Sequence, residues 1–432
     1  MPQSNHKINH TLYLCYFGLR EPLVQTQVLP YLREIKKLGD LKISLLTFEP
    51  NMKEKWTDEQ IESERAKLAG ENINWYCLPY HKRPSAPATL YDVFRGALFS
   101  RRMIQRENVN VLHARVHTPA MMGAIAKKLS GGRAKMIFDI RGFFPEEYTD
   151  AGVWKENGRL YKTVKKIEKW LLKEADGFVV LTEKARSILF PESAETNFDK
   201  SNRPIEVIPC CVDLKRFESA NEILRSETRR KYNLENRRVI AYVGSFGGWY
   251  MTDEMMDFFR VAKKHDESTF ALILTQSNAE MISALLRERG YSENDFLIKK
   301  VSPAEIPLYL SASDAAISFI KACYSKQASS PTKIAEYLAC GLPVISNSGV
   351  GDLDALIDGE KVGVIARGFT DDDYLRALDE INVLLNRENI KEENIKEHCR
   401  WVAYKYFDLN EIGGESYRKL YRRLLNGKTA LD

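Results

Sequence analysis

The sequence has 432 residues, 44% of them apolar, and a net charge of +5 with histidine counted as neutral, a composition typical of a globular protein with two or three domains. It contains no run near the roughly 18 apolar residues that a membrane-spanning helix requires, and the apolar stretch at residues 12–19 is too short for a secretion signal. The charge is too small to indicate nucleic-acid binding, and the seven cysteines include no C-x-x-C pair, so we expect a cytoplasmic protein without structural disulfides or zinc that binds no nucleic acid.

Short apolar runs alternate with helical patterns along the first half of the chain. The predicted helices between these runs include residues 25–38 and 91–108. The predicted strands are residues 11–17, 43–48, 109–114, 134–140 and 177–182. This alternation predicts an α/β fold with a parallel sheet covered by helices on both faces.

The pattern changes around residues 202–217, where an apolar strand is broken by Pro209 and a polar helix at 220–232 follows. Alternation then restarts, with predicted strands at 239–244, 270–275, 295–299, 315–319 and 343–347. We therefore predict two α/β domains, residues 1–209 and 210–409. A terminal helix at 410–432 carries an apolar stripe at helical spacing, made of Tyr417, Leu420, Tyr421 and Leu424.

The strongest single motif is the run at residues 329–345, S-S-P-T-K-I-A-E-Y-L-A-C-G-L-P-V-I. Ser330 is a good N-cap before Pro331, and Gly341 is placed just past the helix end. A free helix N-terminus with Lys333 suits a phosphate, and Glu336 shares a face with Lys333, where its carboxylate suits a ribose. The alternative is an ordinary capped helix with a solvated Lys–Glu pair, and spacing alone does not separate the two.

This run resembles the donor-site motif of the family 4 (group 1) retaining glycosyltransferases, in which an E-A-L-A-C-G-x-P-V-I block is characteristic. Residues 167–182, 206–217 and 309–318 resemble further motifs of that family in the same order, so the resemblance covers most of the chain. It implies the GT-B fold, with two Rossmann-like doubly wound domains facing across a cleft. The nucleotide sugar would bind to residues 210–409, and the helix at 410–432 would pack back on the first domain.

The resemblance implies donor-binding roles around the helix of this motif. Glu336 would bind the ribose and Lys333 the diphosphate, with Ser330 and Thr332 beside them. The family usually carries a second glutamate near the transferred sugar, eight positions before the glutamate that corresponds to Glu336. That position is Ala328 in this sequence, so the residue that reads the sugar is left open.

The loop after the predicted strand 239–244 also departs from the family pattern. The family usually places an arginine and a lysine there to hold the diphosphate, whereas residues 244–250 read G-S-F-G-G-W-Y. Glycines let backbone approach a phosphate closely. We therefore expect backbone amides, together with Ser245, Gly247 and Lys326, to hold the phosphates beside Lys333; a plain tight turn is the alternative.

Candidate catalytic residues lie in the first domain. The family commonly shows His-x-His at the strand end that reads V-L-H-A-R-V-H-T-P here, residues 111–119. This sequence keeps His113, has Arg115 at the second position and adds His117, and a lone histidine is more often structural than catalytic. Arg141 follows the next strand and either forks onto a phosphate or carboxylate or forms a buried pair with Asp139. Gly18, after the first strand, is a predicted donor contact by resemblance.

A basic helix predicted at residues 159–173 raises the question of a membrane. Its lysines would form one face, and its core-facing stripe would be Leu160, Val164, Ile167 and Leu171. Such a patch suits an anionic membrane surface, although a solvated charged face is the more common explanation. A peripheral position on the inner face of the membrane would fit the lipid-linked acceptors that many family members use.

The predicted function is transfer of a hexosyl group, with retention, from a UDP-sugar such as UDP-glucose or UDP-GlcNAc. The acceptor would be a glycan or a lipid-linked glycan in polysaccharide or cell-envelope synthesis. No cofactor or metal is expected, because the D-x-D within residues 349–354 belongs, in metal-dependent transferases, to a different fold. Two rivals are a nucleotide-sugar epimerase on the same fold and a non-catalytic partner in glycan synthesis.

Overall fold

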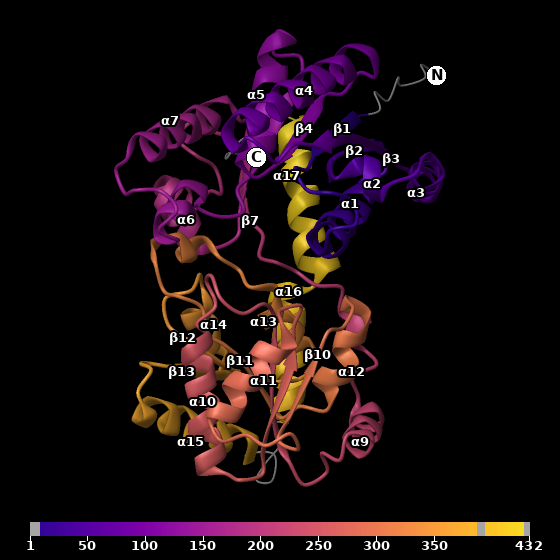
Figure 1. Ribbon diagram of the computed structural model, residues 1–432. Helices are drawn as coiled ribbons and strands as arrows, with labels where there is room; N and C mark the ends of the chain where they lie inside the picture. Colours follow the sequence, from indigo (N-terminus) through magenta and orange to yellow (C-terminus); the bar gives the residue numbers. More distant parts are fainter. Residues whose placement is uncertain (1–8, 387–393, 427–432) are drawn as a thin grey trace, which may run out of the picture. The chain divides into compact units, whose positions relative to one another are not determined.

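The computed structural model describes residues 9–386 and 394–426, and the chain divides into two compact units (Figure 1). The N-terminal unit comprises the chain up to Ile208 together with the chain from Gly413 onward, and the C-terminal unit is Pro209–Ile412. Each unit is an α/β layer structure with its own parallel sheet. Among the described residues, none of the helices is long and apolar enough to span a bilayer.

The N-terminal unit contains a seven-stranded sheet in the order β3-β2-β1-β4-β5-β6-β7, with all neighbours parallel. Its strands are β1 Asn9–Leu14, β2 Leu41–Pro50, β3 Ile73–Tyr80, β4 Val111–Arg115, β5 Lys135–Asp139, β6 Gly177–Val180 and β7 Ile205–Val207. The strand order reverses between β1 and β4. The loops after these two strands therefore meet at the switch point, where open α/β sheets bind ligands.

Helices cover both faces of this sheet (Figure 1). They are η1 Val24–Val28, α1 Leu29–Lys36, α2 Met52–Lys55, α3 Asp58–Gly70, α4 Ser85–Arg106, α5 His117–Leu129, α6 Phe144–Asp150, α7 Arg159–Glu174, α8 Glu183–Leu189, η2 Pro191–Ser193 and α17 Glu415–Asn426. α4 packs against α5, whereas α17 packs against α1 and β7. The stripe predicted on the terminal helix is the buried face of α17, because Tyr417, Leu420, Tyr421 and Leu424 are at most 3% exposed.

The C-terminal unit has a six-stranded parallel sheet in the order β10-β9-β8-β11-β12-β13. Its strands are β8 Arg238–Val243, β9 Thr269–Leu274, β10 Phe296–Lys299, β11 Ala315–Ser318, β12 Val344–Asn347 and β13 Gly363–Ala366. Its helices are η3 Leu214–Phe217, α9 Glu222–Lys231, α10 Thr252–His265, α11 Ala279–Glu288, η4 Pro303–Glu305, α12 Ile306–Ser311, η5 Tyr324–Ala328, α13 Thr332–Ala339, α14 Leu353–Glu360, α15 Asp371–Asn386 and α16 Ile395–Phe407, and the short π-helix η7 spans Leu409–Gly414. Two apolar clusters, one on each face, bury the sheet. The order reverses between β8 and β11, which places the loops after these strands at the switch point.

The predicted α/β fold with two Rossmann-like sheets is confirmed, with differences in detail. β3 and β13 are absent from the predicted strands. β3 reads I-N-W-Y-C-L-P-Y and β13 is only four residues long, and both lie at a sheet edge, where most of their residues are only half-buried. The helix predicted at 91–108 begins earlier, at Ser85. Leu160 is not core-facing as predicted but 50% exposed, because the buried positions of α7 lie in its second half, at Glu168 and Leu171.

Candidate functional site

The helix of the strongest sequence motif is α13, which begins immediately after an extended Pro331 and has no side-chain cap. The prediction that Ser330 caps this helix is wrong, because the Ser330 Oγ instead accepts a hydrogen bond from the Cys210 amide at 3.0 Å. The predicted end is confirmed, since Gly341 follows Cys340 with a φ of +78°. Any side chain there would press on Lys396, whose backbone oxygen lies 3.0 Å from an added Cβ. Because no side chain of the described residues caps α13, the first backbone amides of the helix, starting at Thr332, lack a capping acceptor.

The Lys333 side chain lies in a closed aromatic setting at the start of α13. The residue is 7% exposed, and its Nζ has no hydrogen-bond partner among the described residues. The Nζ lies 4.3 Å from the ring centroids of both Tyr242 and Tyr250. Burial lowers the pKa of Lys333 to about 7, although the charge of Glu336 opposes this shift. An ammonium group held away from water without a counter-ion is costly, so this position favours an anion brought by a ligand.

Glu336 lies one turn further along α13 and is 8% exposed. Burial raises its pKa to about 7, against the attraction of Arg216 and Lys333. A carboxylate in its ionised form accepts hydrogen bonds only, as a ribose with two hydroxyl donors requires. The predicted pair of an anion-binding lysine and a hydroxyl-binding glutamate therefore lies on one short helix.

The loop between β8 and α10, residues 244–251, packs directly on Lys333. Gly244 has a φ of +146°, and a Cβ added there would come within 2.7 Å of the Lys333 Nζ. Only glycine lets the backbone approach the ammonium group so closely. The loop is tied to the end of β11, because the Met251 amide donates to the Phe319 carbonyl at 3.3 Å and the Lys321 amide donates to the Trp249 carbonyl at 2.9 Å.

Two predictions for this loop fare differently. The Gly247 amide is not free for a phosphate as expected, because it already donates to the Thr252 Oγ1 at 2.9 Å. The Ser245 carbonyl accepts the Tyr242 hydroxyl at 2.5 Å, which leaves the Ser245 hydroxyl as the predicted contact. Lys326, 7% exposed, lies with its Nζ 4.1 Å from the centre of the Trp249 ring. Lys326 and Lys333 thus both lie against aromatic rings. The sequence does not predict these rings as part of the site, although the W-Y pair after the glycines of the loop is a signal for two of them.

Two side chains, those of Asn347 and Asp354, fix the loop after β12 by hydrogen bonds. The Asn347 side chain accepts the Ile320 amide at 2.8 Å and donates to the Ile320 carbonyl at 2.9 Å. Asp354 accepts the Gly349 amide at 3.1 Å. Throughout residues 9–386 and 394–426, no group of three His, Cys, Asp or Glu side chains is placed to hold a metal ion. The carboxylate of Asp354 in the D-x-D segment thus serves as a hydrogen-bond acceptor for its own loop.

In the N-terminal unit, the three predicted catalytic residues surround one carboxylate, that of Asp139. The Arg141 Nε lies 2.8 Å from the Asp139 Oδ1, and the His113 Nε2 and Arg115 Nη1 lie 3.5 and 3.8 Å from its Oδ2. The Tyr417 hydroxyl donates to the same Oδ2 at 2.9 Å. Burial opposes ionisation of Asp139, but its cationic neighbours, Arg141 above all, hold its pKa well below the usual range. We call these residues, with Tyr421, the Asp139 cluster.

The Asp139 cluster is closed by α17. The His113 imidazole is fully buried, and its Nδ1 is 3.0 Å from the Tyr421 hydroxyl. Burial lowers the pKa of His113 and so favours the neutral ring, whereas the negative charge of Asp139 acts in the opposite direction. Arg141 also bonds to the Tyr417 hydroxyl. Of the two roles that the sequence leaves open for Arg141, this geometry favours the buried pair with Asp139, and His113 lies against the same carboxylate. Substrate contact by these residues stays a prediction.

Arg115 is the last residue of β4 and belongs to the Asp139 cluster. Its side chain is 3% exposed, and its Nε and Nη1 have no hydrogen-bond partner among the described residues. With Arg141 it places two guanidinium groups against the single carboxylate of Asp139. The residue after it, Val116, has a φ of +62°, a strained conformation for a β-branched side chain. Strain and unpaired donors therefore coincide at the end of β4, beside the switch point.

The other predicted positions in this unit have internal partners. The loop after β1 is held by Glu49, whose Oε1 accepts the Leu19 amide at 2.9 Å. A Cβ added to Gly18 would meet the Glu49 Oε2 at 2.8 Å, so Gly18 is required for this close approach. His117 is buried, with its Nε2 3.0 Å from the Glu168 Oε2. Gly18 thus has a packing role, and donor contact there remains a prediction.

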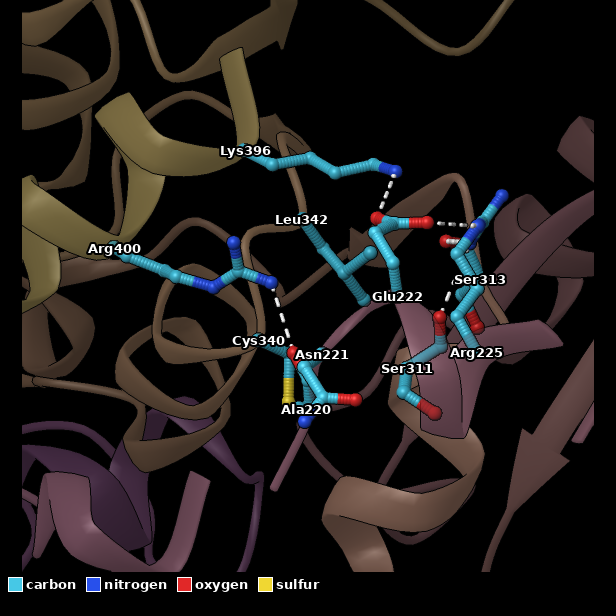
Figure 2. A pocket seen from close by; sticks show the side chains of 10 residues that line it. All are labelled: Ala220, Asn221, Glu222, Arg225, Ser311, Ser313, Cys340, Leu342, Lys396 and Arg400. Carbon is cyan, nitrogen blue, oxygen red and sulfur yellow. Dashed lines mark hydrogen bonds and ion pairs between the residues drawn. The ribbon is translucent and has the colours of Figure 1, made fainter. Parts of the chain in front are cut away.

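A separate basic hollow in the C-terminal unit lies among α9, α13 and α16 (Figure 2). Its cations are already paired: Lys396 with Glu222 at 2.9 Å, and Arg225 with Asp314 at 2.6 Å. Arg400 donates to a backbone carbonyl, that of Ala220, at 2.9 Å. The space inside is about 10 Å³, room for about one water molecule. This hollow therefore joins three helix ends and does not fit a nucleotide.

Two protein-family profiles match the chain, one for the most part in each unit. The profile of the family described as Glycosyl transferases group 1 matches residues 225–407, and that of Glycosyltransferase Family 4 matches residues 57–216. No curated protein sequence gives a match.

Solved structures of other proteins share the fold. A glycosyltransferase from Rickettsia africae aligns with a TM-score of 0.69 and 17% identity over 98% of this chain and 100% of its own. HepE from Anabaena in complex with UDP aligns with a TM-score of 0.65 and 14% identity, over 97% of this chain and 100% of its own. WaaG, a glycosyltransferase involved in lipopolysaccharide biosynthesis, aligns with a TM-score of 0.61 and 12% identity, over 95% of this chain and 99% of its own.

Proposed function

Because this chain belongs to the group 1 (family 4) glycosyltransferases and is a nucleotide-sugar-dependent enzyme of the GT-B fold, we propose that it transfers a hexosyl group from a UDP-sugar with retention. The acceptor would be a glycan or a lipid-linked glycan of the cell envelope, reached from the cytoplasmic side. The observation that carries the proposal is the buried Lys333 ammonium group at the uncapped start of α13, which has no hydrogen-bond partner in residues 9–386 and 394–426. A diphosphate supplies the anion that this position lacks.

The proposed chemistry uses charge stabilisation. The bond between the anomeric carbon and the β-phosphate oxygen breaks, and the acceptor oxygen bonds to the same carbon on the same face. The acceptor proton passes to the departing phosphate. Lys333 and the first amides of α13 stabilise the negative charge that grows on the diphosphate. Glu336 holds the ribose, so that the donor is fixed at both ends of its nucleotide.

The proposal of UDP and of an envelope acceptor has support from relatives of the fold. HepE has been solved with UDP, and WaaG is involved in lipopolysaccharide biosynthesis. Arg115 would meet the donor sugar or acceptor, because it ends β4 beside the switch point and its Nε and Nη1 make no hydrogen bond among the described residues. His113 would act through its neighbours in the Asp139 cluster.

The test is a ligand panel followed by product analysis. UDP-, GDP- and ADP-sugars are compared by thermal shift, since a ligand at a hundred times its Kd stabilises by about 2.7 kcal/mol. Stabilisation by UDP-sugars that is lost in Lys333→Met supports the donor site, and no shift with any nucleotide sugar contradicts it. The anomeric configuration of the product, measured by NMR, tests retention. Conversion of the donor sugar without an acceptor would instead indicate the epimerase.

A further inference from the structure

The outer face of α4 is apolar, which is unusual for a helix on a protein surface. Leu90, Tyr91, Phe94 and Leu98 are 62%, 53%, 56% and 40% exposed. Their spacing places them on one face of the helix. The opposite face is buried in the N-terminal unit, through side chains that include Val93, Ala97 and Ile104. α4 thus has two apolar faces, and exposed apolar patches mark binding surfaces.

Cations without an ion pair lie along the same stretch of chain, on α4 and in the loop before it. The basic residues from 82 to 106 are Lys82, Arg83, Arg95, Arg101, Arg102 and Arg106. Within the described parts of the chain, none of these six forms an ion pair. The single carboxylate in the same stretch is Asp92, which is fully buried and accepts hydrogen bonds from the Tyr16 hydroxyl and the His81 amide. The exposed surface of residues 82–106 is therefore apolar and positively charged, with no acidic side chain.

We propose that this surface, the outer face of α4 with its cations, docks on a bilayer that contains anionic lipids. Leucine, phenylalanine and tyrosine side chains enter the boundary between headgroups and acyl chains, as the apolar face of an interfacial helix does. The arginines and the lysine around them meet the lipid phosphates. Charge complementarity selects this occupant over a second copy of the chain, because a two-fold dimer through the same face would bring its cations against each other.

The docking face is connected to the switch point of the N-terminal sheet. α4 follows β3, at the carboxyl edge of the sheet. The hydrogen bond from Tyr16 to Asp92, 2.8 Å long, joins the end of β1 to the second turn of α4. Docking would thus hold the loop that contains Gly18 close to the lipid surface. This inference does not depend on which sugar is transferred, or on whether transfer occurs.

α7, the basic helix singled out in the sequence, provides a control for pure charge. Its exposed lysines include Lys162, Lys166 and Lys169, whereas Lys165 is bonded to Glu168 and Glu146. The helix has no row of exposed apolar residues like that of α4, because only Leu160 among its apolar residues is strongly exposed. A surface that binds by charge alone would use α7 as readily as α4. A surface that inserts apolar side chains requires α4.

The test is co-sedimentation of the full chain with vesicles, without any sugar donor. Vesicles of phosphatidylcholine are compared with vesicles that also contain phosphatidylglycerol. We expect binding to the anionic vesicles alone, and Leu90→Ser combined with Phe94→Ser should weaken it about tenfold or more. The matched apolar control is Ile223→Ser with Val383→Ser, two exposed positions of the C-terminal unit. The charge control is Lys162→Gln with Lys166→Gln and Lys169→Gln.

The outcomes separate clearly. Loss of binding in the α4 variant, with both controls near wild type and an unchanged melting temperature, supports the proposal. Equal binding of the α4 variant and the wild type overturns it, as does a wild type that ignores anionic vesicles at low salt. A wild-type dimer that the α4 variant converts to a monomer would overturn it in favour of a second copy. Since no donor is present, these results are independent of the proposed transfer reaction.

Discussion

The two units bury cations in opposite ways. In the Asp139 cluster, Arg141 forms an ion pair with a carboxylate that also accepts a hydrogen bond from a tyrosine hydroxyl, and the pKa of Asp139 is held low. At the start of α13, the ammonium group of Lys333 has aromatic rings beside it but no hydrogen bond to any residue that the structure describes, and its pKa is lowered. A buried charge with a partner from the same unit contributes to the fold. A buried charge without one is destabilising until a ligand arrives, and so it indicates a binding site.

This comparison predicts that Asp139→Asn damages the fold. The substitution leaves Arg141 and Arg115 facing each other in a closed space, and breaking a buried pair costs about 3–5 kcal/mol. Urea unfolding of the full chain should show this loss. Asp253→Asn, at a carboxylate whose side chain is 79% exposed, should change stability by less than about 0.5 kcal/mol. If Asp139→Asn unfolds like the wild type, the cluster is not what holds α17.

Lys333→Met should have the opposite effect to Asp139→Asn: it should preserve stability and weaken ligand binding. Methionine has a similar length and no charge, so the folded chain without ligand should be as stable as wild type or more so. UDP binding should weaken by about 2–5 kcal/mol, because a charge-assisted contact in a buried site is lost. Calorimetry with UDP measures the second effect and thermal melting the first. Lys162→Met on the exposed side of α7 is the control, and a Lys333→Met protein that binds UDP normally would remove Lys333 from the donor site.

Sequence reasoning reached these two regions unequally. Local patterns identified α13, its end at Gly341 and the Lys333–Glu336 pair, because helix signals and i, i+3 spacing are properties of neighbouring residues. The contact between Tyr417 and Asp139 joins residues 278 positions apart, and the spacing in α17 predicts only an apolar stripe for its tyrosines. Their hydroxyl partners depend on how α17 packs on the sheet. The aromatic rings around Lys333 were missed for the same reason.

The two tyrosines of α17 sharpen the first half of the comparison. The Tyr417 hydroxyl donates to an ionised carboxylate, and the Tyr421 hydroxyl meets the neutral ring of His113. A hydrogen bond to a charged group contributes about 1.5–3 kcal/mol and a neutral one about 0.5–1.5 kcal/mol. Tyr417→Phe should therefore lower the free energy of unfolding more than Tyr421→Phe. Both rings are fully buried, so the pair is matched in packing, and equal losses would mean that Asp139 is not the charged centre.

The pH dependence of UDP binding tests the second half. The diphosphate requires protonated Lys333, whose pKa is about 7 without ligand, so affinity should fall as pH rises above that value, by at most about tenfold per unit. Glu336 must be ionised to accept the ribose, and its pKa is raised to about 7, so affinity should also fall as pH decreases below that value. A maximum near neutrality follows. In Lys333→Met the alkaline limb should disappear, and in Glu336→Gln the acidic limb should. An unchanged profile in both variants would show that neither group titrates in the binding step.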